Sequence, residues 1–403
     1  MVFQCKEIFF DIPAEGLLFS AEKDGEKVLS CCYKNGCVDF WIRYDFDERP
    51  LHLIGKAKDG SKGKILLLPF RIELWIDGVL MDEEWPCGSH FLENSSIDVE
   101  GCSIQISDRE YVEQEEPAVV GTFQNAEGWR PEENVFVGDC MPYAHEGVYH
   151  VLYLKDRHHH QSKWRKGAHQ WSHISTKNFV DWEIHPMAVA IDDPKEGSIC
   201  TGSWICHEGK HYLYYTVRMC DGSPATICRS LSEDGYHFKK DREFSFVLSE
   251  RYTAASARDP KIVKDEQGLF HMIITTSLTE TGIGCLAHLV SDDLNSWNEL
   301  EEPLYIAPED KGEPECPDYF YKDGYYYLIC SLRGRAYYLY SKEPFSGWKQ
   351  AEDPIPCESV PKAAEWNGRL IFTGFNKMND YAGTLTFMEA QVKPDGELTY
   401  NKL

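Results

Sequence analysis

The segment KDGYYYLICS (322–331) joins an Asp-Gly turn to a run of aromatic and β-branched residues. Asp-Gly adopts positive φ at low cost and favours tight hairpins, whereas aromatic and β-branched residues favour strands. Four other segments share this form: EGVYHVLYL (146–154), EGKHYLYYTV (208–217), EQGLFHMIITT (266–276) and WNGRLIFTGF (366–375). Their turn glycines, at 147, 209, 268, 324 and 368, are spaced by 62, 59, 56 and 44 residues. The chain therefore contains five copies of one unit.

A second pattern follows the first four copies, in which a serine is followed by polar turn residues and then an aromatic. The four segments are STKNFVDW (175–182), SEDGYHF (232–238), SDDLNSW (291–297) and SKEPFSGW (341–348). We interpret them as turns between a third and a fourth strand, with the aromatic packing between neighbouring sheets. About four strands per repeat is typical of a β-propeller. We predict an all-β protein with a five-bladed β-propeller over residues 119–403, in preference to a β-sandwich.

Residues 1–118 predict a smaller β-sandwich-like domain. Strand-like runs alternate with Gly, Asp and Lys turns, and Asp77-Gly78 predicts a hairpin within RIELWIDGVLMDEEW (71–85). Trp75 and Trp85 favour core or hinge packing over sugar binding. The charged segment YVEQEEPAVV (111–120) is predicted to be the linker. This domain packs on the propeller or on another subunit, so homo-oligomer formation stays open.

Composition excludes several classes of partner. The formal net charge of −25 over 403 residues argues against nucleic acid, which is bound by clustered Lys and Arg. No run approaches the 18 or so apolar residues of a membrane span, and the N-terminus does not resemble a signal peptide. The 15 cysteines contain no C-x-x-C pair, which predicts reduced thiols in a cytoplasmic protein rather than disulfides or zinc. We expect no cofactor and no metal.

Three carboxylates recur at the start of the predicted inner strands. Asp139, Asp259 and Glu315 precede the next turn glycine by 8, 9 and 9 residues, and Thr201 occupies the corresponding place in the second blade at 8. We predict that the three acids share one rung and face a central funnel. Turn or strand-entry acids are the alternative for any one of them, but three together favour a functional site.

Clustered carboxyl groups suit glycoside hydrolysis, because proximity and burial raise the pKa of at least one of them. A protonated and an ionised carboxyl are the pair that this reaction requires. Calcium is the other chemistry for clustered acids, but there is no D-x-D-x-D run. The RHHHQ segment (157–161) lacks a second ligand cluster for zinc and predicts a loop at the funnel rim.

These motifs resemble glycoside hydrolase family 32, the β-fructosidases. HQWSHISTKNFVDWEIHPMAVAIDD (169–193) parallels the first blade of that family, and TGSW (201–204) stands at its F-S-G-S segment. ARDPKIV (257–263) carries the Arg-Asp-Pro motif and PECPDYF (314–320) the Glu-Cys-Pro-Asp motif. The resemblance covers about 280 residues in the family order.

The resemblance implies an oligosaccharide substrate and cleavage of terminal fructosyl linkages with retention. It implies Asp139 as nucleophile, Glu315 as general acid/base and Asp259 as transition-state stabiliser. We expect substrate contacts from the neighbouring residues of these motifs and of the rim loop, namely Arg258, Thr201, Ser203, Trp204, Asp156, His158 and Cys316.

Two departures from the family pattern fall near the expected site. The W-M-N-D-P-N-G motif is here FVGDCMPYA (136–144), with Gly138 before the aspartate, and Leu154 replaces a glutamine one strand later. Changed hydrogen-bonding groups alter which sugar is accepted. An arabinosidase- or xylosidase-like enzyme, fructosyl transfer, and a non-catalytic carbohydrate-binding propeller therefore stay open.

Overall fold

The computed structural model describes residues 2–92, 95–112, 117–132, 134–157, 168–357, 359–379 and 381–403. These residues form antiparallel β-strands without any α-helix, and the 3₁₀ turn η2 (Ala254–Ser256) interrupts them. Among them no helix is long and apolar enough to cross a membrane. The predicted all-β class is confirmed.

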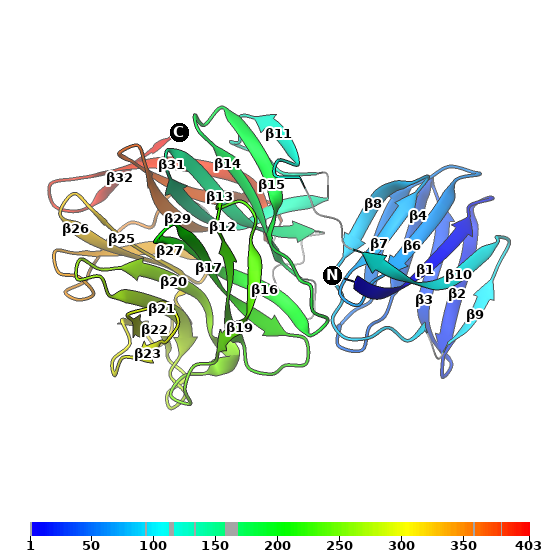
Figure 1. Ribbon diagram of the computed structural model, residues 1–403, viewed down its shortest axis with the longest axis horizontal. Helices are drawn as coiled ribbons and strands as arrows, with labels where there is room; N and C mark the ends of the chain where they lie inside the picture. Colours follow the sequence, from blue (N-terminus) through cyan, green and yellow to red (C-terminus); the bar gives the residue numbers. More distant parts are fainter. Residues whose placement is uncertain are drawn as a thin grey trace.

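Strands β1 to β10 form two five-stranded sheets that pack face to face at the right of Figure 1. The first sheet has the order β10 (Ile104–Val112), β1 (Val2–Asp11), β6 (Lys62–Leu67), β7 (Ile72–Ile76) and β8 (Val79–Glu84). The second has the order β5 (Leu51–Lys56), β4 (Cys37–Ile42), β3 (Glu26–Lys34), β2 (Gly16–Lys23) and β9 (Ser96–Val99). Alternating residues such as Ile8, Phe40 and Leu74 fill the space between them.

The remaining strands form the five blades of the propeller at the left of Figure 1. Blade 1 contains β12 (Val135–His145), β13 (Val148–Arg157), β14 (Gln170–Thr176) and β15 (Asp181–Val189), with β11 (Gly121–Gln124) at its outer edge. Blade 2 contains β16 (Glu196–His207), β17 (Lys210–Met219), β18 (Thr226–Ser232) and β19 (Lys239–Phe246).

Blades 3 to 5 repeat this plan. Blade 3 contains β20 (Arg258–Lys264), β21 (Phe270–Ser277), β22 (Gly284–Ser291), β23 (Asn298–Glu299) and β24 (Tyr305–Ile306). Blade 4 contains β25 (Glu315–Lys322), β26 (Tyr325–Leu332), β27 (Arg335–Ser341) and β28 (Lys349–Gln350). Blade 5 contains β29 (Ser359–Trp366), β30 (Arg369–Lys377), β31 (Gly383–Val392) and β32 (Leu398–Lys402).

The predicted hairpin turns connect the first two strands of the blades. In blade 4, for example, Asp323 and Gly324 both have positive φ, 47° and 88°, between the paired residues Lys322 and Tyr325. Both central residues of a type I′ turn require that conformation. The aromatics of the second pattern pack on the preceding blade. Trp297 of blade 3 meets Tyr214 of blade 2 with ring centroids 5.9 Å apart, and Phe345 of blade 4 stacks on His271 of blade 3 at 4.0 Å.

The first and last blades are joined directly. Val137 of β12 pairs with Gly383 of β31. The segment before β12 continues this edge, because Leu385 accepts from the Gly128 amide at 2.8 Å and donates to the Trp129 carbonyl at 2.9 Å. These bonds close the ring of blades.

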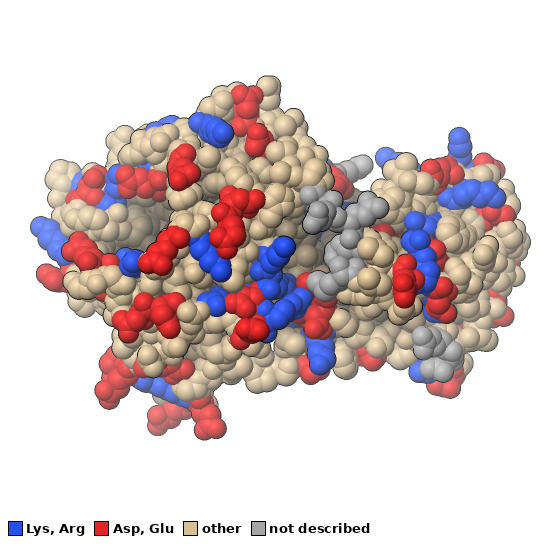
Figure 2. All heavy atoms as spheres, in the orientation of Figure 1, with Lys and Arg blue, Asp and Glu red and all other residues tan. Residues whose placement is uncertain are grey.

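The sandwich contacts blade 1 through β8. Glu83 accepts from Lys155 Nζ at 2.8 Å and from Arg157 at 3.0 Å, while Asp82 accepts from Arg157 at 3.1 Å. Phe70 and Trp85 lie in an apolar cluster with propeller side chains. Figure 2 shows acidic side chains spread over both parts of the molecule, with Lys and Arg between them. The domain boundary at residue 118 stays a prediction, placed between β10 and β11.

The Glu83 ion pairs provide a test of this contact. Burial opposes ionisation of Glu83, but Lys155 and Arg157 outweigh it and lower its pKa to about 2. Glu83→Ala should lower the free energy of unfolding at pH 7 by about 3 kcal/mol, because it leaves two mostly buried cations short of a partner. Chemical denaturation measures this, with the exposed Glu26→Ala as control. Because the folded pKa is depressed, the deficit should shrink as pH falls from about 4.5 towards 2. Equal stability of the two variants at pH 7 would show that the Glu83 ion pairs do not stabilise the contact between the sandwich and blade 1.

Candidate active site

A β-bulge interrupts the inner strand of every blade near the start of that strand. The hydrogen-bond register shifts between Val137 and Cys140, Ile199 and Gly202, Arg258 and Lys261, Glu315 and Asp318, and Ser359 and Lys362. Bulges re-aim side chains and are frequent beside active sites. In blades 3 and 4 the first bulged residues, Asp259 and Cys316, have positive φ of 59° and 52°. A proline follows each of them, so no ladder hydrogen bond is lost at the next residue.

The three predicted acids converge at these bulges, but they do not share one rung. Glu315 lies just before its bulge, Asp259 is the first bulged residue and Asp139 is the second. The spacing to the turn glycine did not reveal this, because the hairpins differ in length. Lys322 pairs with Tyr325 across two turn residues, whereas Lys264 pairs with Phe270 across five.

Asp139 is buried, with 9% of its surface exposed, and its carboxylate accepts three hydrogen bonds. Thr201 Oγ1 donates to Oδ2 at 2.9 Å, and the Cys316 thiol lies 3.4 Å from the same oxygen. Tyr381 Oη donates to Oδ1 at 3.0 Å. Burial and the charge of Asp259 raise the pKa of Asp139, while these three donors lower it. The donors favour the ionised form that a nucleophile needs.

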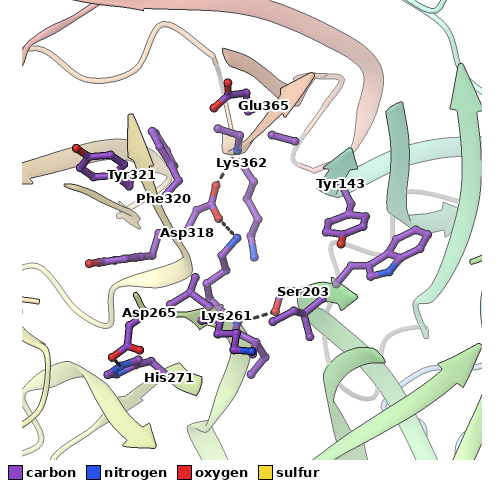
Figure 3. A pocket seen from close by; sticks show the side chains of 18 of the residues that line it. Tyr143, Ser203, Lys261, Asp265, His271, Asp318, Phe320, Tyr321, Lys362 and Glu365 are labelled. Carbon is purple, nitrogen blue, oxygen red and sulfur yellow. Dashed lines mark hydrogen bonds and ion pairs between the residues drawn. The ribbon is translucent and has the colours of Figure 1, made fainter. Parts of the chain in front are cut away.

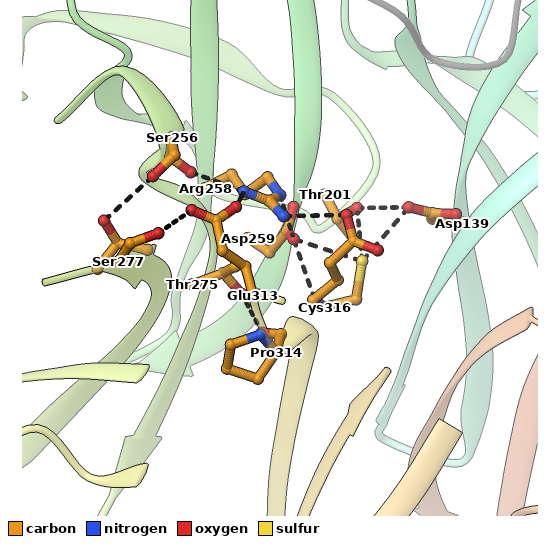
Figure 4. Close-up of polar contacts among 12 residues, drawn as sticks. Asp139, Thr201, Ser256, Arg258, Asp259, Thr275, Ser277, Glu313, Pro314 and Cys316 are labelled. Carbon is orange, nitrogen blue, oxygen red and sulfur yellow. Dashed lines mark hydrogen bonds and ion pairs between the residues drawn. The ribbon is translucent and has the colours of Figure 1, made fainter. Parts of the chain in front are cut away.

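Cys316 links two of the acids (Figure 4). Its backbone N–H donates to Asp259 Oδ2 at 3.0 Å, and its thiol lies 3.5 Å from that oxygen and 3.4 Å from Asp139 Oδ2. Burial raises the pKa of this thiol well above its usual value, and both aspartates raise it further. The thiol is therefore a neutral hydrogen-bond donor between two carboxylates, rather than a nucleophile.

Glu315 has a different environment, with 46% of its side chain exposed. Arg258 is forked between two glutamates, because NH2 donates to Glu315 Oε1 at 2.9 Å and NH1 donates to Glu313 Oε2 at 2.5 Å. Ser277 Oγ also donates to Glu313. Burial raises the pKa of Glu315, and the charges of Asp259 and Asp139 add to this, against the opposing effect of Arg258.

The two carboxyl groups differ in their environments. Asp139 is enclosed and saturated with donors, whereas Glu315 reaches solvent and has a single cationic partner that it shares. An ionised carboxyl beside one that holds a proton is the pair that glycoside hydrolysis requires. Asp259, fixed by the Cys316 amide and 3% exposed, presents a third carboxylate to the same space.

The structure does not bring all predicted substrate contacts to these acids. Ser203 Oγ donates to the Pro260 carbonyl at 3.0 Å and accepts from the Ile262 amide at 2.9 Å, so it joins blades 2 and 3. Trp204 is 5% exposed and lies in an apolar cluster, with its indole N–H directed to His211. These contacts give Ser203 and Trp204 structural roles.

Asp156 also lies outside the immediate site. Asp156 is fully buried and its Oδ1 lies 2.8 Å from His169 Nε2, behind Tyr381. His158 lies outside the described residues. Arg258, Thr201 and Cys316 are therefore the predicted substrate-binding residues that the structure places among the acids.

Two site residues were missed by sequence reasoning. Glu313 precedes Glu315 by two residues, in the acid-rich segment GEPECPDYF (312–320), so its proximity was visible in the sequence. Tyr381 lies in the connection between β30 and β31, 242 residues from Asp139, and no repeat or motif marks it. Only the closure of the ring brings it to the site.

A charged layer lies on the hairpin side of the bulges, where the inner strands line a cavity of about 560 Å³ (Figure 3). Lys261 Nζ lies 2.6 Å from Asp318 Oδ1, and the Ala363 amide donates to Asp318 Oδ2 at 2.7 Å. Lys362, 3% exposed, donates to the Gly202 carbonyl at 3.0 Å, and burial lowers its pKa. Asp318 is thus held by structural contacts to Lys261 and the Ala363 amide.

One group in the described part of the chain has the spacing of a metal site. Donor atoms of His145, Cys206 and His211 lie within 4.8 Å of one another. However, Trp204 donates to His211 Nδ1 at 3.1 Å, so Nε2 of the neutral ring carries the proton. His211 then offers no lone pair to a metal, and the group does not form a three-ligand site.

Comparisons with known proteins agree with this fold. The N-terminal domain of the glycosyl hydrolases of family 32 matches residues 124–352. The sucrose-6-phosphate hydrolase of Bacillus subtilis (strain 168) is 34% identical over 198 residues, which are 46% of this chain and 40% of that protein. The raffinose invertase of Escherichia coli is 26% identical over 216 residues, 51% of this chain and 42% of that protein. The aligned part thus spans less than half the length of these relatives.

Among solved structures, fructan 1-exohydrolase IIa from Cichorium intybus superposes with a TM-score of 0.58. The sequences are 14% identical, and the match covers 69% of this chain and 60% of that one. At this identity the likeness shows the fold, a five-bladed propeller.

Asp139 and Asp318 allow the acid predicted to be the nucleophile to be compared with an acid in structural contacts. Asp139→Asn should leave the free energy of unfolding at pH 7 unchanged or increase it, because it removes a buried charge beside Asp259. Asp318→Asn should lower it by about 3 kcal/mol, because Lys261 loses its buried partner. Since the pKa of Asp139 is raised in the folded protein, the wild type loses stability as pH rises above about 4. The free energy of unfolding of Asp139→Asn, relative to that of the wild type, should therefore increase between pH 4 and 7, as measured by calorimetry. A large loss of stability would show that Asp139 is structural.

Proposed function

This chain belongs to the glycosyl hydrolases of family 32, and we propose that it cleaves terminal fructosyl linkages of short oligosaccharides with retention of configuration. The observation that carries the proposal is the contrast between Asp139, enclosed by three donors, and Glu315, half exposed on a shared arginine. Relatives that act on sucrose-6-phosphate or raffinose support the choice of a fructoside.

In the first step, the Asp139 carboxylate bonds to the anomeric carbon while the bond from that carbon to the leaving oxygen breaks. Glu315 gives its proton to this oxygen, so the leaving sugar departs as a neutral alcohol. The raised pKa of Glu315 favours the protonated form that a general acid needs. The product is a glycosyl ester of Asp139.

In the second step, Glu315, now ionised, takes a proton from water as the water oxygen attacks the anomeric carbon. The ester bond breaks and the Asp139 carboxylate is restored. Positive charge develops on the sugar in both steps, and Asp259 supplies a fixed negative charge beside it. Two displacements at one carbon give net retention.

We also infer that the enzyme works in the cytoplasm, in a reducing environment. None of the 15 cysteines is paired in a disulfide, and the site uses the Cys316 thiol as a donor to two carboxylates. That contact requires the reduced form.

The direct experiment measures monosaccharide release from sucrose, sucrose-6-phosphate, raffinose, short inulin- and levan-type oligosaccharides, and aryl pentosides. We expect fructose from at least one fructoside. Asp139→Asn and Glu315→Gln should each lower kcat by at least 10³-fold while remaining folded, because each removes a reacting group. Proton NMR of the first-formed fructose should show the substrate configuration.

Each other outcome of this panel has a defined meaning. Pentose release without fructose would move the substrate class to that of arabinosidases or xylosidases. Fructosyl products longer than the substrate would indicate transfer. No product from any sugar, with unchanged stability of both variants, would favour a carbohydrate-binding propeller.

Glu313 should set the alkaline limit of activity. In the wild type it shares Arg258 with Glu315 and adds a negative charge beside it. Glu313→Gln removes that charge, and Arg258 then pairs with Glu315 as its one charged glutamate. Both changes lower the pKa of Glu315. Glu315 then loses its proton at lower pH, so the alkaline limb of kcat/KM should move to lower pH and activity at pH 8 should fall a few-fold. The control is Glu301→Gln at an exposed position. An unchanged or upward-shifted limb would contradict this role.

A further inference from the structure

The Tyr381 hydroxyl makes two hydrogen bonds to one residue. It donates to Asp139 Oδ1 at 3.0 Å and accepts from the Asp139 backbone N–H at 3.2 Å. Together these bonds fix the hydroxyl against both the main chain and the carboxylate of Asp139. Tyr381 comes from the connection between β30 and β31 of blade 5, whereas Asp139 lies on β12 of blade 1.

Gly138 provides the space for this hydroxyl. A Cβ atom at position 138 would lie 2.5 Å from Tyr381 Oη, closer than non-bonded atoms approach, and 3.1 Å from Tyr381 Cζ and the Leu154 carbonyl. Gly138 does not have positive φ, so its backbone conformation does not require glycine. Glycine is therefore required at position 138 because it leaves space for the Tyr381 side chain. Gly138 is also the position at which this chain lacks the asparagine of the W-M-N-D-P-N-G motif.

The tyrosine ring is held from behind. His169 stacks on it with ring centroids 5.6 Å apart and an interplanar angle of 22°, and Phe375 meets it edge-on at 5.5 Å. His169 is itself fixed by Asp156, 2.8 Å from its Nε2, and both residues are fully buried. This support restricts the ring to one position, as a precisely placed donor requires.

The Asp139 oxygens are not equivalent. Oδ2 is within reach of both Thr201 and Cys316, whereas Oδ1 has one side-chain donor among the described residues, the tyrosine hydroxyl. Oδ1 therefore keeps the more accessible lone pair, and the attack on the anomeric carbon is assigned to it. Burial and the Asp139 charge raise the pKa of Tyr381 well above its usual value, so the phenol remains a donor at working pH.

We propose that Gly138 and Tyr381 act as a matched pair, in which the glycine admits the tyrosine hydroxyl and the hydroxyl positions Asp139 Oδ1 for attack. The inference rests on the proposed function, since it takes Asp139 as the nucleophile. Tyr381 is then a positioning residue that holds one rotamer of the carboxylate and favours its ionised form. The pair connects the first blade to the last.

The first test is the pH profile of Tyr381→Phe. The titratable groups facing Asp139 are Asp259 on β20, Glu315 and Cys316 on β25, Cys200 on β16, Cys140 on its own strand, and Tyr381. Only Tyr381 changes in this variant. Losing its hydrogen bond raises the pKa of Asp139, so the acid limb of kcat/KM should move to higher pH. We expect kcat to fall roughly tenfold to hundredfold, as for a lost bond to a charged group, with little change in KM.

The matched control is Tyr149→Phe. Tyr149 is also buried at the junction of blades 1 and 5, and its hydroxyl lies 2.6 Å from Thr373 Oγ1. This variant should lose stability without moving the acid limb. If Tyr381→Phe behaves in the same way, with lower stability and an unchanged pH profile, its role is structural and the proposal is wrong.

The second test combines the two positions. Gly138→Ala should lower kcat more than Tyr381→Phe, because the new methyl group displaces the hydroxyl and disturbs the bulge. The double variant Gly138→Ala/Tyr381→Phe removes the closest clashing atom, so its kcat should rise from that of Gly138→Ala towards that of Tyr381→Phe, short of it by the effect of the 3.1 Å contacts with Cζ of residue 381 and the Leu154 carbonyl. Additive losses in kcat and in stability would overturn the matched pair, since only residues in contact show such coupling.

A third measurement does not depend on activity. Unfolding free energies of Tyr381→Phe, Asp139→Asn and the double variant form a cycle whose interaction energy reports the hydroxyl–carboxylate bond. A coupling that is significant at pH 7 and disappears as Asp139 gains a proton supports the pair even if no fructoside is cleaved. A zero coupling overturns the pair even if the proposed function holds. The two proposals therefore fail separately.

Discussion

Mutual repulsion among three carboxylates is the constraint that the other residues of the site offset. Asp139 and Asp259 both lie within reach of one thiol, and Arg258 pairs with Glu315 and lies 3.6 Å from Asp259 Oδ2. Such a group is stable only where donors and a cation offset the repulsion and the loss of hydration. Thr201, Cys316 and Tyr381 supply neutral donors, and Arg258 supplies the cation. Because the compensation is unequal, the three carboxyl groups have different surroundings.

The backbone produces this difference between the surroundings of the three carboxyl groups. The same bulge occurs in the inner strands of three blades. The acids occupy three consecutive positions relative to it, each in a different blade. Asp139 is directed into the protein, whereas Glu315 stays half exposed. A regular strand would present all three at one level with similar surroundings. Irregularity at the start of the inner strands thus gives chemically alike groups different surroundings.

Much of the fold was predictable, because turns and strand residues recur together. Asp-Gly and Glu-Gly turns and the aromatics that pack on the preceding blade are local features, and each copy repeats them. The bulges also left a signal, since Asp259-Pro260 and Cys316-Pro317 place a residue without an N–H where the ladder is interrupted. The rung assignment was wrong in detail because the hairpins differ in length. Tyr381 could not be predicted, since neither spacing nor composition connects it to Asp139, and Ser203 and Trp204 were placed by motif although their contacts are internal.

The closure of the ring has a consequence for how the protein is made. Asp139 is synthesised with blade 1, whereas its partner Tyr381 follows only with the last blade, 242 residues later. Until β31 pairs with β12 and with residues 128 and 129, the ring is open and the carboxylate lacks one of its donors. The four earlier blades can form their own hairpins on the ribosome, but they cannot complete the site. The proposed activity should therefore emerge only after the C-terminal strands leave the exit tunnel, and a stalled or truncated chain would retain its acids without a complete site.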